Sequence, residues 1–132
     1  MSKSIVVFLT LGGLFALTHV FATITSLYWY YPWFDVVMHF WGGLLIVLGV
    51  RVLNHLQLVK KTNKRTVFGI ALLMMLAWEV FEYTIGFVSQ STYLFDTIKD
   101  IFVGGLGVLT GYLILKQKNK SYEFMYIPLR IY

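Results

Sequence analysis

The sequence predicts an all-α integral membrane protein, a bundle of four transmembrane helices with the N and C termini in the cytoplasm. Of the 132 residues, 58% are hydrophobic and only 13% are charged, whereas a typical soluble domain carries about 25% charged residues. Four long apolar segments follow one another, and a helix needs about 20 apolar residues to cross a bilayer. The alternating pattern of barrel strands is absent, which leaves helices as the spanning elements.

The composition also excludes several other classes of protein. A soluble body of this size is mostly surface, and this chain has too few charges to cover it. Intrinsic disorder requires low hydrophobicity and high charge, which is the opposite of what is found. Because there is no cysteine, disulfide scaffolds, thiolate metal sites and cysteine nucleophiles are excluded.

We expect one membrane domain over residues 1–132, with no room for a separate soluble domain. The predicted helices cover approximately residues 5–27, 36–53, 67–88 and 97–115, and residues 116–132 form a basic and aromatic cytoplasmic tail. The first segment, with Lys3 ahead of its apolar run, has some features of a signal peptide. Its length and the poor cleavage site at residues 20–22 favour a spanning helix instead.

The distribution of basic residues sets the predicted orientation. Residues 54–66 and the tail are rich in lysine and arginine, whereas residues 28–35 and 89–96 contain neither. The positive-inside rule therefore places both termini in the cytoplasm, and we expect the inner or plasma membrane of a prokaryote. This accounts for the net charge of +5 without a nucleic-acid partner. The aromatic residues 28–34 are typical of a belt at the outer interface.

Five of the six acidic residues lie within, or at the outer ends of, the predicted helices. A carboxylate inside a bilayer is expensive and usually faces a cavity or a partner. Three helices each carry two polar residues spaced so that they share a face: Asp35 with His39, Glu79 with Glu82, and Asp96 with Asp100. All six fall in the outer half of the membrane. We expect His19, at a similar depth, to be a satisfied core histidine, and Lys99 to extend to the outer interface.

Small residues continue these faces toward the inner half of the membrane. They include Gly42 and Gly49 on the second helix, Gly12 on the first, and Gly104, Gly107 and Gly111 on the fourth. Small residues allow membrane helices to approach closely. We therefore expect a tight inner seam and an outer half that opens into a polar pocket.

Three motifs resemble those of the YjdF-like membrane proteins, within the wider VanZ-like group, over roughly residues 35–111. They are Asp35-Val-Val-Met-His39-Phe-Trp-Gly-Gly43, Trp78-Glu79-Val-Phe-Glu82 and Asp96-Thr97-Ile-Lys-Asp100-Ile-Phe-Val-Gly-Gly-Leu-Gly107. One branch is named for teicoplanin resistance, which implies envelope or lipid-linked wall chemistry. The VanZ-like pattern often has Glu-x-x-Gln where this chain has Glu79 and Glu82.

The acidic and histidine residues favour a divalent metal site. Several carboxylates cannot all be ionised in a low-dielectric pocket unless cations neutralise them, and helical bundles build metal sites from such residues. The ligand candidates are His39, Glu79, Glu82 and Asp100, followed by Asp35 and Asp96. These ligands suit Zn, Mn, Mg or Fe, and Asp35 could instead orient His39. We expect Glu79, Glu82 and Asp100 to be the catalytic residues.

The predicted function is metal-assisted binding or hydrolysis of a phosphate-bearing or lipid-linked substrate approached from the outer leaflet. A metal-dependent hydrolase or transferase is the enzyme class that this implies. Two alternatives stay open: a proton- or cation-coupled transporter, and a non-catalytic assembly protein with a structural polar core. Membrane lipid is the expected partner, and self-association into a homo-oligomer is left open.

Overall fold

The computed structural model describes residues 3–59, 63–85 and 93–125, with side chains up to residue 116. Its elements are α1 (Lys3–Ile24), α2 (Leu27–Tyr30), α3 (Pro32–His55), α4 (Lys64–Thr84) and α5 (Tyr93–Met125). Within these ranges there is no strand, and four helices are long and apolar enough to cross a membrane. The predicted class, an all-α protein with four membrane-spanning helices, is confirmed.

The ends of the helices differ from the sequence-based estimates. The connection expected at residues 28–35 contains α2, and α3 begins at Pro32, because proline has no N–H to lose at the first position of a helix. At α4 the side chain of Asn63 accepts a hydrogen bond of 2.9 Å from the backbone N–H of Thr66, so the helix begins earlier than expected. Helix α5 continues to Met125, into the segment expected to be a tail. Residues 86–88, assigned to the third predicted helix, lie outside the described residues.

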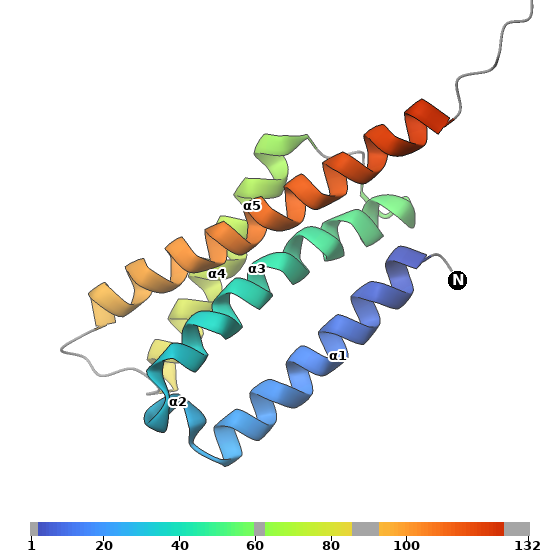
Figure 1. Cartoon of the computed structure of the whole chain (residues 1–132). Helices are drawn as coiled ribbons and strands as arrows, with labels where there is room; N and C mark the ends of the chain where they lie inside the picture. Colours follow the sequence, from blue (N-terminus) through green and yellow to red (C-terminus); the bar gives the residue numbers. More distant parts are fainter. Residues whose placement is uncertain (1–2, 60–62, 86–92, 126–132) are drawn as a thin grey trace, which may run out of the picture.

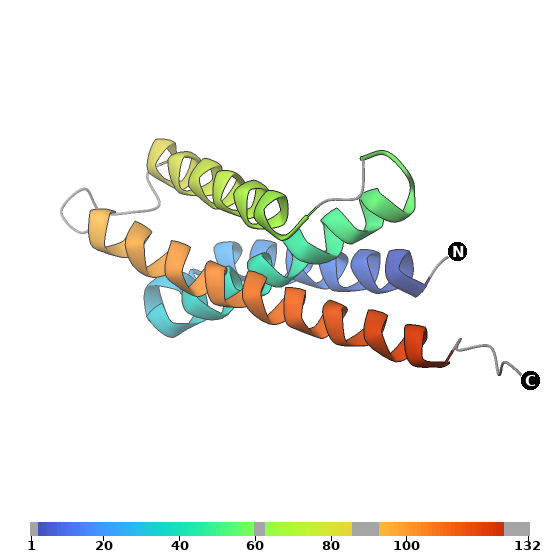
Figure 2. The same cartoon turned by 90° about the horizontal axis from the view of Figure 1, so that it is seen from above.

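Helix α3 is the centre of the bundle. It packs against α1, α2, α4 and α5, whereas the backbone of α1 approaches neither α4 nor α5 in the described ranges. Figure 1 shows α3 between α1 and α5, and Figure 2 shows α4 stacked on the same group from another side. The start of α1 and the end of α5 lie at one end of the bundle (Figures 1 and 2).

The closest packing is between α3 and α5, and glycine makes it possible. A Cβ atom added to Gly43 would overlap the carbonyl oxygen of Gly104, and one added to Gly107 would overlap the carbonyl oxygen of Phe40. Because only backbone atoms fill these positions, no side chain can move aside to make room. A tight seam is therefore present between these two helices.

The sequence had suggested a tight seam that involves the first helix and the Gly42 and Gly49 face of the second, but the observed seam is less extensive. On α3 it uses Gly43, whereas Gly42 and Gly49 face α1, where an added Cβ would meet the ring of Phe15 at 3.9 Å and the ring of Phe8 at 3.2 Å respectively. On α1, a Cβ added to Gly12 would meet nothing within 4 Å. That part of the prediction is wrong because Gly42 and Gly43 point about 100° apart on the helix, and only one of them can face α5.

We expect Gly43→Ala to destabilise the protein more than Gly105→Ala does. Gly43 has no room for a methyl group, and overpacking typically costs about 1–3 kcal/mol. Gly105 on α5 is the matched control outside the seam, because nothing lies within 4 Å of its added Cβ and alanine is the better helix former. Thermal unfolding in detergent is the measurement. Equal midpoints for the two variants would contradict the close backbone contact.

Candidate functional site

His39 lies at the centre of the acidic residues and contacts carboxylates from three helices. Its Nε2 is 3.3 Å from Oδ1 of Asp35, one turn earlier on α3, and 3.8 Å from Oδ2 of Asp100 on α5. Its Nδ1 is 4.0 Å from Oε1 of Glu79 on α4. Only 10% of the side chain is exposed. Nε2 therefore faces Asp35 and Asp100, whereas Nδ1 faces Glu79, and the imidazole contacts all three helices.

Two of these carboxylates are almost completely buried. Asp100 is 1% exposed and Glu79 is 3% exposed. Oδ1 of Asp100 makes no hydrogen bond, although the ammonium of Lys99 lies 3.3 Å away. A buried carboxylate without hydrogen bonds loses its hydration and gains little in return. The ammonium of Lys99 therefore supplies the positive charge that faces this oxygen of Asp100.

Lys99 supplies positive charge on one side of the site. Its Nζ is 2.6 Å from Oδ1 of Asp96 and 3.3 Å from Oδ2 of Asp35, in addition to its contact with Asp100. The expectation that Lys99 extends to the outer interface is met only in part, because its side chain is 31% exposed but its charge lies among three carboxylates. Asp96 is a partner of Lys99 and does not join a group of possible metal ligands.

The other five predicted ligands form two groups that share His39. Ligand atoms of Asp35, His39 and Asp100 lie within 4.8 Å of one another, and so do those of His39, Glu79 and Glu82. The ion pairs with Lys99 neutralise part of the first group. Within the described residues, no lysine or arginine lies within ion-pair distance of Glu79 or Glu82. The second group therefore has the greater deficit of positive charge.

Tyr28 is a residue of the site that the sequence analysis placed in the aromatic belt. The hydroxyl of Tyr28 on α2 lies 2.7 Å from Nδ1 of His19 on α1. Its neighbours Trp29 and Tyr30 are more than 70% exposed, as expected for a belt. Burial, together with the nearby carboxylates Asp35 and Glu82, raises the pKa of the Tyr28 hydroxyl above its usual range. The hydroxyl therefore stays protonated and can donate a hydrogen bond to Nδ1 of His19.

Trp78 completes this edge of the site, and the sequence analysis did not assign it a role. The rings of His19 and Trp78 are in edge contact with their centroids 5.5 Å apart, so these side chains join α1 to α4 although the backbones stay apart. The expectation of a satisfied histidine at position 19 agrees with these contacts. The spacing of Trp78 and Glu82 by four residues was the available signal, because it puts them on one face of α4.

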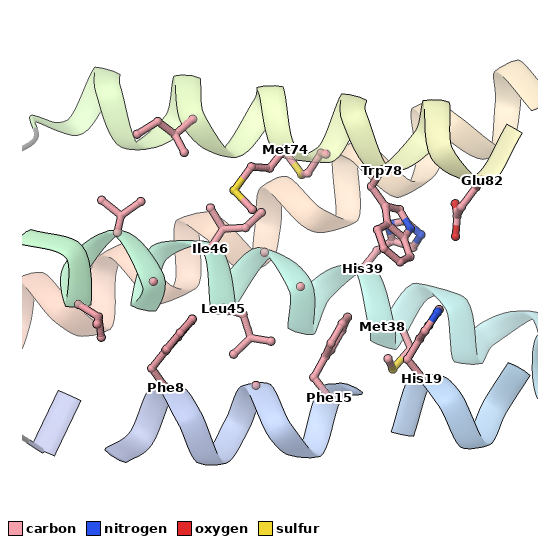
Figure 3. A pocket seen from close by; sticks show the side chains of 18 of the residues that line it. Phe8, Phe15, His19, Met38, His39, Leu45, Ile46, Met74, Trp78 and Glu82 are labelled. Atoms are coloured by element: carbon pink, nitrogen blue, oxygen red, sulfur yellow. The ribbon is translucent and has the colours of Figure 1, made fainter. Parts of the chain in front are cut away.

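Two cavities meet at the site. A groove of about 520 Å³ runs between α1, α3 and α4, and is lined by apolar side chains except at one end. Figure 3 shows Phe8 and Phe15 on one wall, Met74 and Trp78 on the other, and His19, His39 and Glu82 at the polar end. A second cavity of about 140 Å³ is polar and includes Lys99 and Asp96. The cavities share four lining residues: His19, Tyr28, Asp35 and Glu82.

We expect Tyr28→Phe to destabilise the protein by about 1 kcal/mol, the usual contribution of one hydrogen bond, and to change the pH dependence of stability. Because the pKa of Tyr28 is raised on folding, its contribution is complete below the ordinary value of 10.0 and declines above it. Thermal unfolding at pH 8 and pH 11 measures this. The wild type should lose more stability between these two values than the variant does, and parallel losses would contradict the assignment.

The comparisons with known proteins give one match. A family model described as "Predicted membrane protein (DUF2238)" matches residues 3–120. No match was found among curated proteins, and none was found among solved structures. The matched range includes all five helices up to residue 120 and every residue of the site.

Proposed function

Because the chain belongs to the DUF2238 family of predicted membrane proteins, it contacts lipid, and we propose that its acidic and histidine cluster binds a divalent metal ion. Through this ion the site would bind, and hydrolyse, a phosphate-bearing or lipid-linked substrate. We further propose the orientation predicted from the charges, with the cluster toward the outer face of a prokaryotic inner or plasma membrane. The resemblance to YjdF-like and VanZ-like proteins agrees with an envelope role.

The observation that carries the proposal is the charge around His39. Five carboxylates lie in this region, namely those of Asp35, Glu79, Glu82, Asp96 and Asp100, and Lys99 is the one lysine or arginine that pairs with them in the described part of the chain. Uncompensated charge is expensive in a low-dielectric site. A divalent ion held by His39, Glu79 and Glu82 would supply the missing charge where no ammonium reaches.

The types of ligand limit the choice of metal. One imidazole with carboxylates suits Zn, Mn or Fe, and carboxylates alone also suit Mg. Three protein ligands leave positions on the ion for water or for an oxygen of the substrate. Asp35 lies 3.3 Å from the imidazole and can orient His39, while Asp100 remains as a buried carboxylate nearby.

These residues support hydrolysis of a phosphate ester. An ion held by His39, Glu79 and Glu82 would supply an activated water for attack on phosphorus, and the bond between phosphorus and the ester oxygen would break as the leaving alcohol takes up the proton that the water releases. Asp100, whose Oδ2 lies 3.8 Å from Nε2 of His39, would carry this proton. The charge of the ion would also offset the repulsion between the phosphate and the carboxylates.

The packing does not favour the transport alternative. A proton or cation crossing the membrane would need polar groups on both sides of the site. Beyond His39 and Asp100, the described residues of α3 and α5 close against each other at Gly43, Gly104 and Gly107. The groove beside them is lined by apolar side chains.

Metal analysis of the chain purified without chelator tests the proposal directly. We expect about one Mn or Zn per chain, and a loss of most of it in Glu79→Gln and Glu82→Gln, because an amide is a weaker ligand than a carboxylate. Asp96→Asn is the matched control and should keep the metal, since Asp96 lies outside both ligand groups. A wild type that holds no metal, and whose unfolding midpoint is unchanged by added Mn or Zn, would refute the site.

Release of inorganic phosphate from hexadecyl phosphate tests the reaction. We expect release with the metal-loaded protein, none after EDTA treatment, and a loss of at least about a hundredfold in Asp100→Asn, the lower end of the usual contribution of a proton-transfer group. Release that survives EDTA would contradict a metal-dependent reaction. A metal-loaded protein that releases no phosphate would refute hydrolysis and leave binding as the role of the site.

A further inference from the structure

The length and the apolar lining of the groove suit the binding of a single hydrocarbon chain. On α3 its lining residues recur every three or four positions from Asp35 to Leu53, and α1 and α4 contribute matching stripes that include Phe8, Phe15 and Met74. The 18 residue steps from Asp35 to Leu53 correspond to about 27 Å at 1.5 Å per residue. This is close to the ~30 Å hydrocarbon core of a bilayer. The groove is therefore long, and it is apolar over most of its length.

Glycine keeps the groove open. Gly12 on α1 and Gly42 on α3 both line it. A Cβ at Gly12 would meet nothing within 4 Å, and one at Gly42 would meet only the far end of the Phe15 ring at 3.9 Å. The backbones of α1 and α4 do not approach each other in the described ranges, and their side chains meet at His19 and Trp78, so a hydrocarbon chain from the surrounding lipid would enter between the two helices away from that end. Neither glycine is needed for close helix packing.

The polar end of the groove determines the kind of ligand. The groove and the polar cavity share His19, Tyr28, Asp35 and Glu82, so a molecule in the groove can extend its head into the polar cavity. That cavity contains Lys99, but its ammonium already faces Asp35, Asp96 and Asp100, so its charge is not free for an anionic head. The cluster of carboxylates would repel an anion unless a metal ion is present, whereas the groove would accept a chain in either case.

We infer that this groove binds the hydrocarbon chain of a phosphate-bearing lipid, with the phosphate in the polar cavity beside the carboxylate and histidine cluster. The inference rests on the proposed metal site for the head of the lipid and on the groove for its chain. It narrows the substrate class to single-chain phospholipids or lipid phosphates whose chain lies along α3. A soluble phosphate ester would leave the groove unused.

Binding of hexadecylphosphonate to the detergent-purified full chain tests the inference by native mass spectrometry. The carbon–phosphorus bond of this probe does not hydrolyse, so turnover cannot remove it. We expect one molecule per chain, bound about tenfold more tightly than hexadecanol. EDTA should abolish that difference and leave hexadecanol binding unchanged, because the hydrocarbon chain of either probe contacts only the groove. Equal binding of the two probes by metal-loaded protein would overturn the inference.

The variants Gly12→Phe and Gly13→Phe test where the hydrocarbon chain of the probe binds. The first variant places a ring in the groove and should abolish binding of both probes. The second is the matched control, because Gly13 does not line the groove and has nothing within 4 Å of its added Cβ. Both variants should keep the metal. Equal probe binding by the two variants would overturn the groove assignment, as would a change of oligomeric state in Gly12→Phe, which would assign the groove to a second copy of the chain.

Metal content measured in the same preparations separates the two proposals. Loss of probe binding in a protein that keeps its metal overturns only the lipid inference. Absence of metal from the wild type, together with an unfolding midpoint that added Mn or Zn does not change, refutes the proposed function, whatever the probes do. Tighter binding of hexadecylphosphonate than of hexadecanol that persists in EDTA would overturn the metal-dependent placement of the head.

Discussion

The close contact between α3 and α5 is the constraint on which the rest of this structure depends. The missing side chain of Gly43 allows the backbone of α3 to meet the carbonyl oxygen of Gly104 on α5, and these two glycines lie one helical turn from His39 and Asp100 respectively. Because the helices are fixed so near these residues, the imidazole and the buried carboxylate are held 3.8 Å apart. A wider seam would separate them and admit lipid or water between the two groups.

The same helix, α3, serves two purposes because adjacent positions on it point in different directions. Its Gly43 side closes against α5, while its Gly42 and Gly49 side forms the floor of the groove between α1 and α4. His39 lies at the polar end of the groove (Figure 3) and one helical turn from Gly43. The proposed metal site and the proposed lipid seat therefore share one rigid element, which would hold the head of a ligand in place once its chain lies along the helix.

The charges of the site divide into a compensated side and an uncompensated side. Lys99 pairs with Asp35, Asp96 and Asp100. The imidazole of His39 is the group that lies beside Glu79 and Glu82. This division separates a structural explanation of the acidic residues from a functional one. Ion pairing with Lys99 compensates the charge of the three aspartates. The charge of the two glutamates has no such partner in the described residues, and the proposed metal ion would compensate it.

The sequence alone determined the membrane class, the four spanning helices and the gathering of polar residues at one depth, because these follow from composition and from 3.6-residue periodicity along single helices. It could not determine which of two adjacent glycines faces α5, that Tyr28 turns inward to His19, or that Lys99 pairs with three carboxylates. Those outcomes depend on the rotation of each helix about its axis and on distances between helices. Only tertiary packing sets these quantities, so only the structure separates the seam from the groove and one group of ligands from the other.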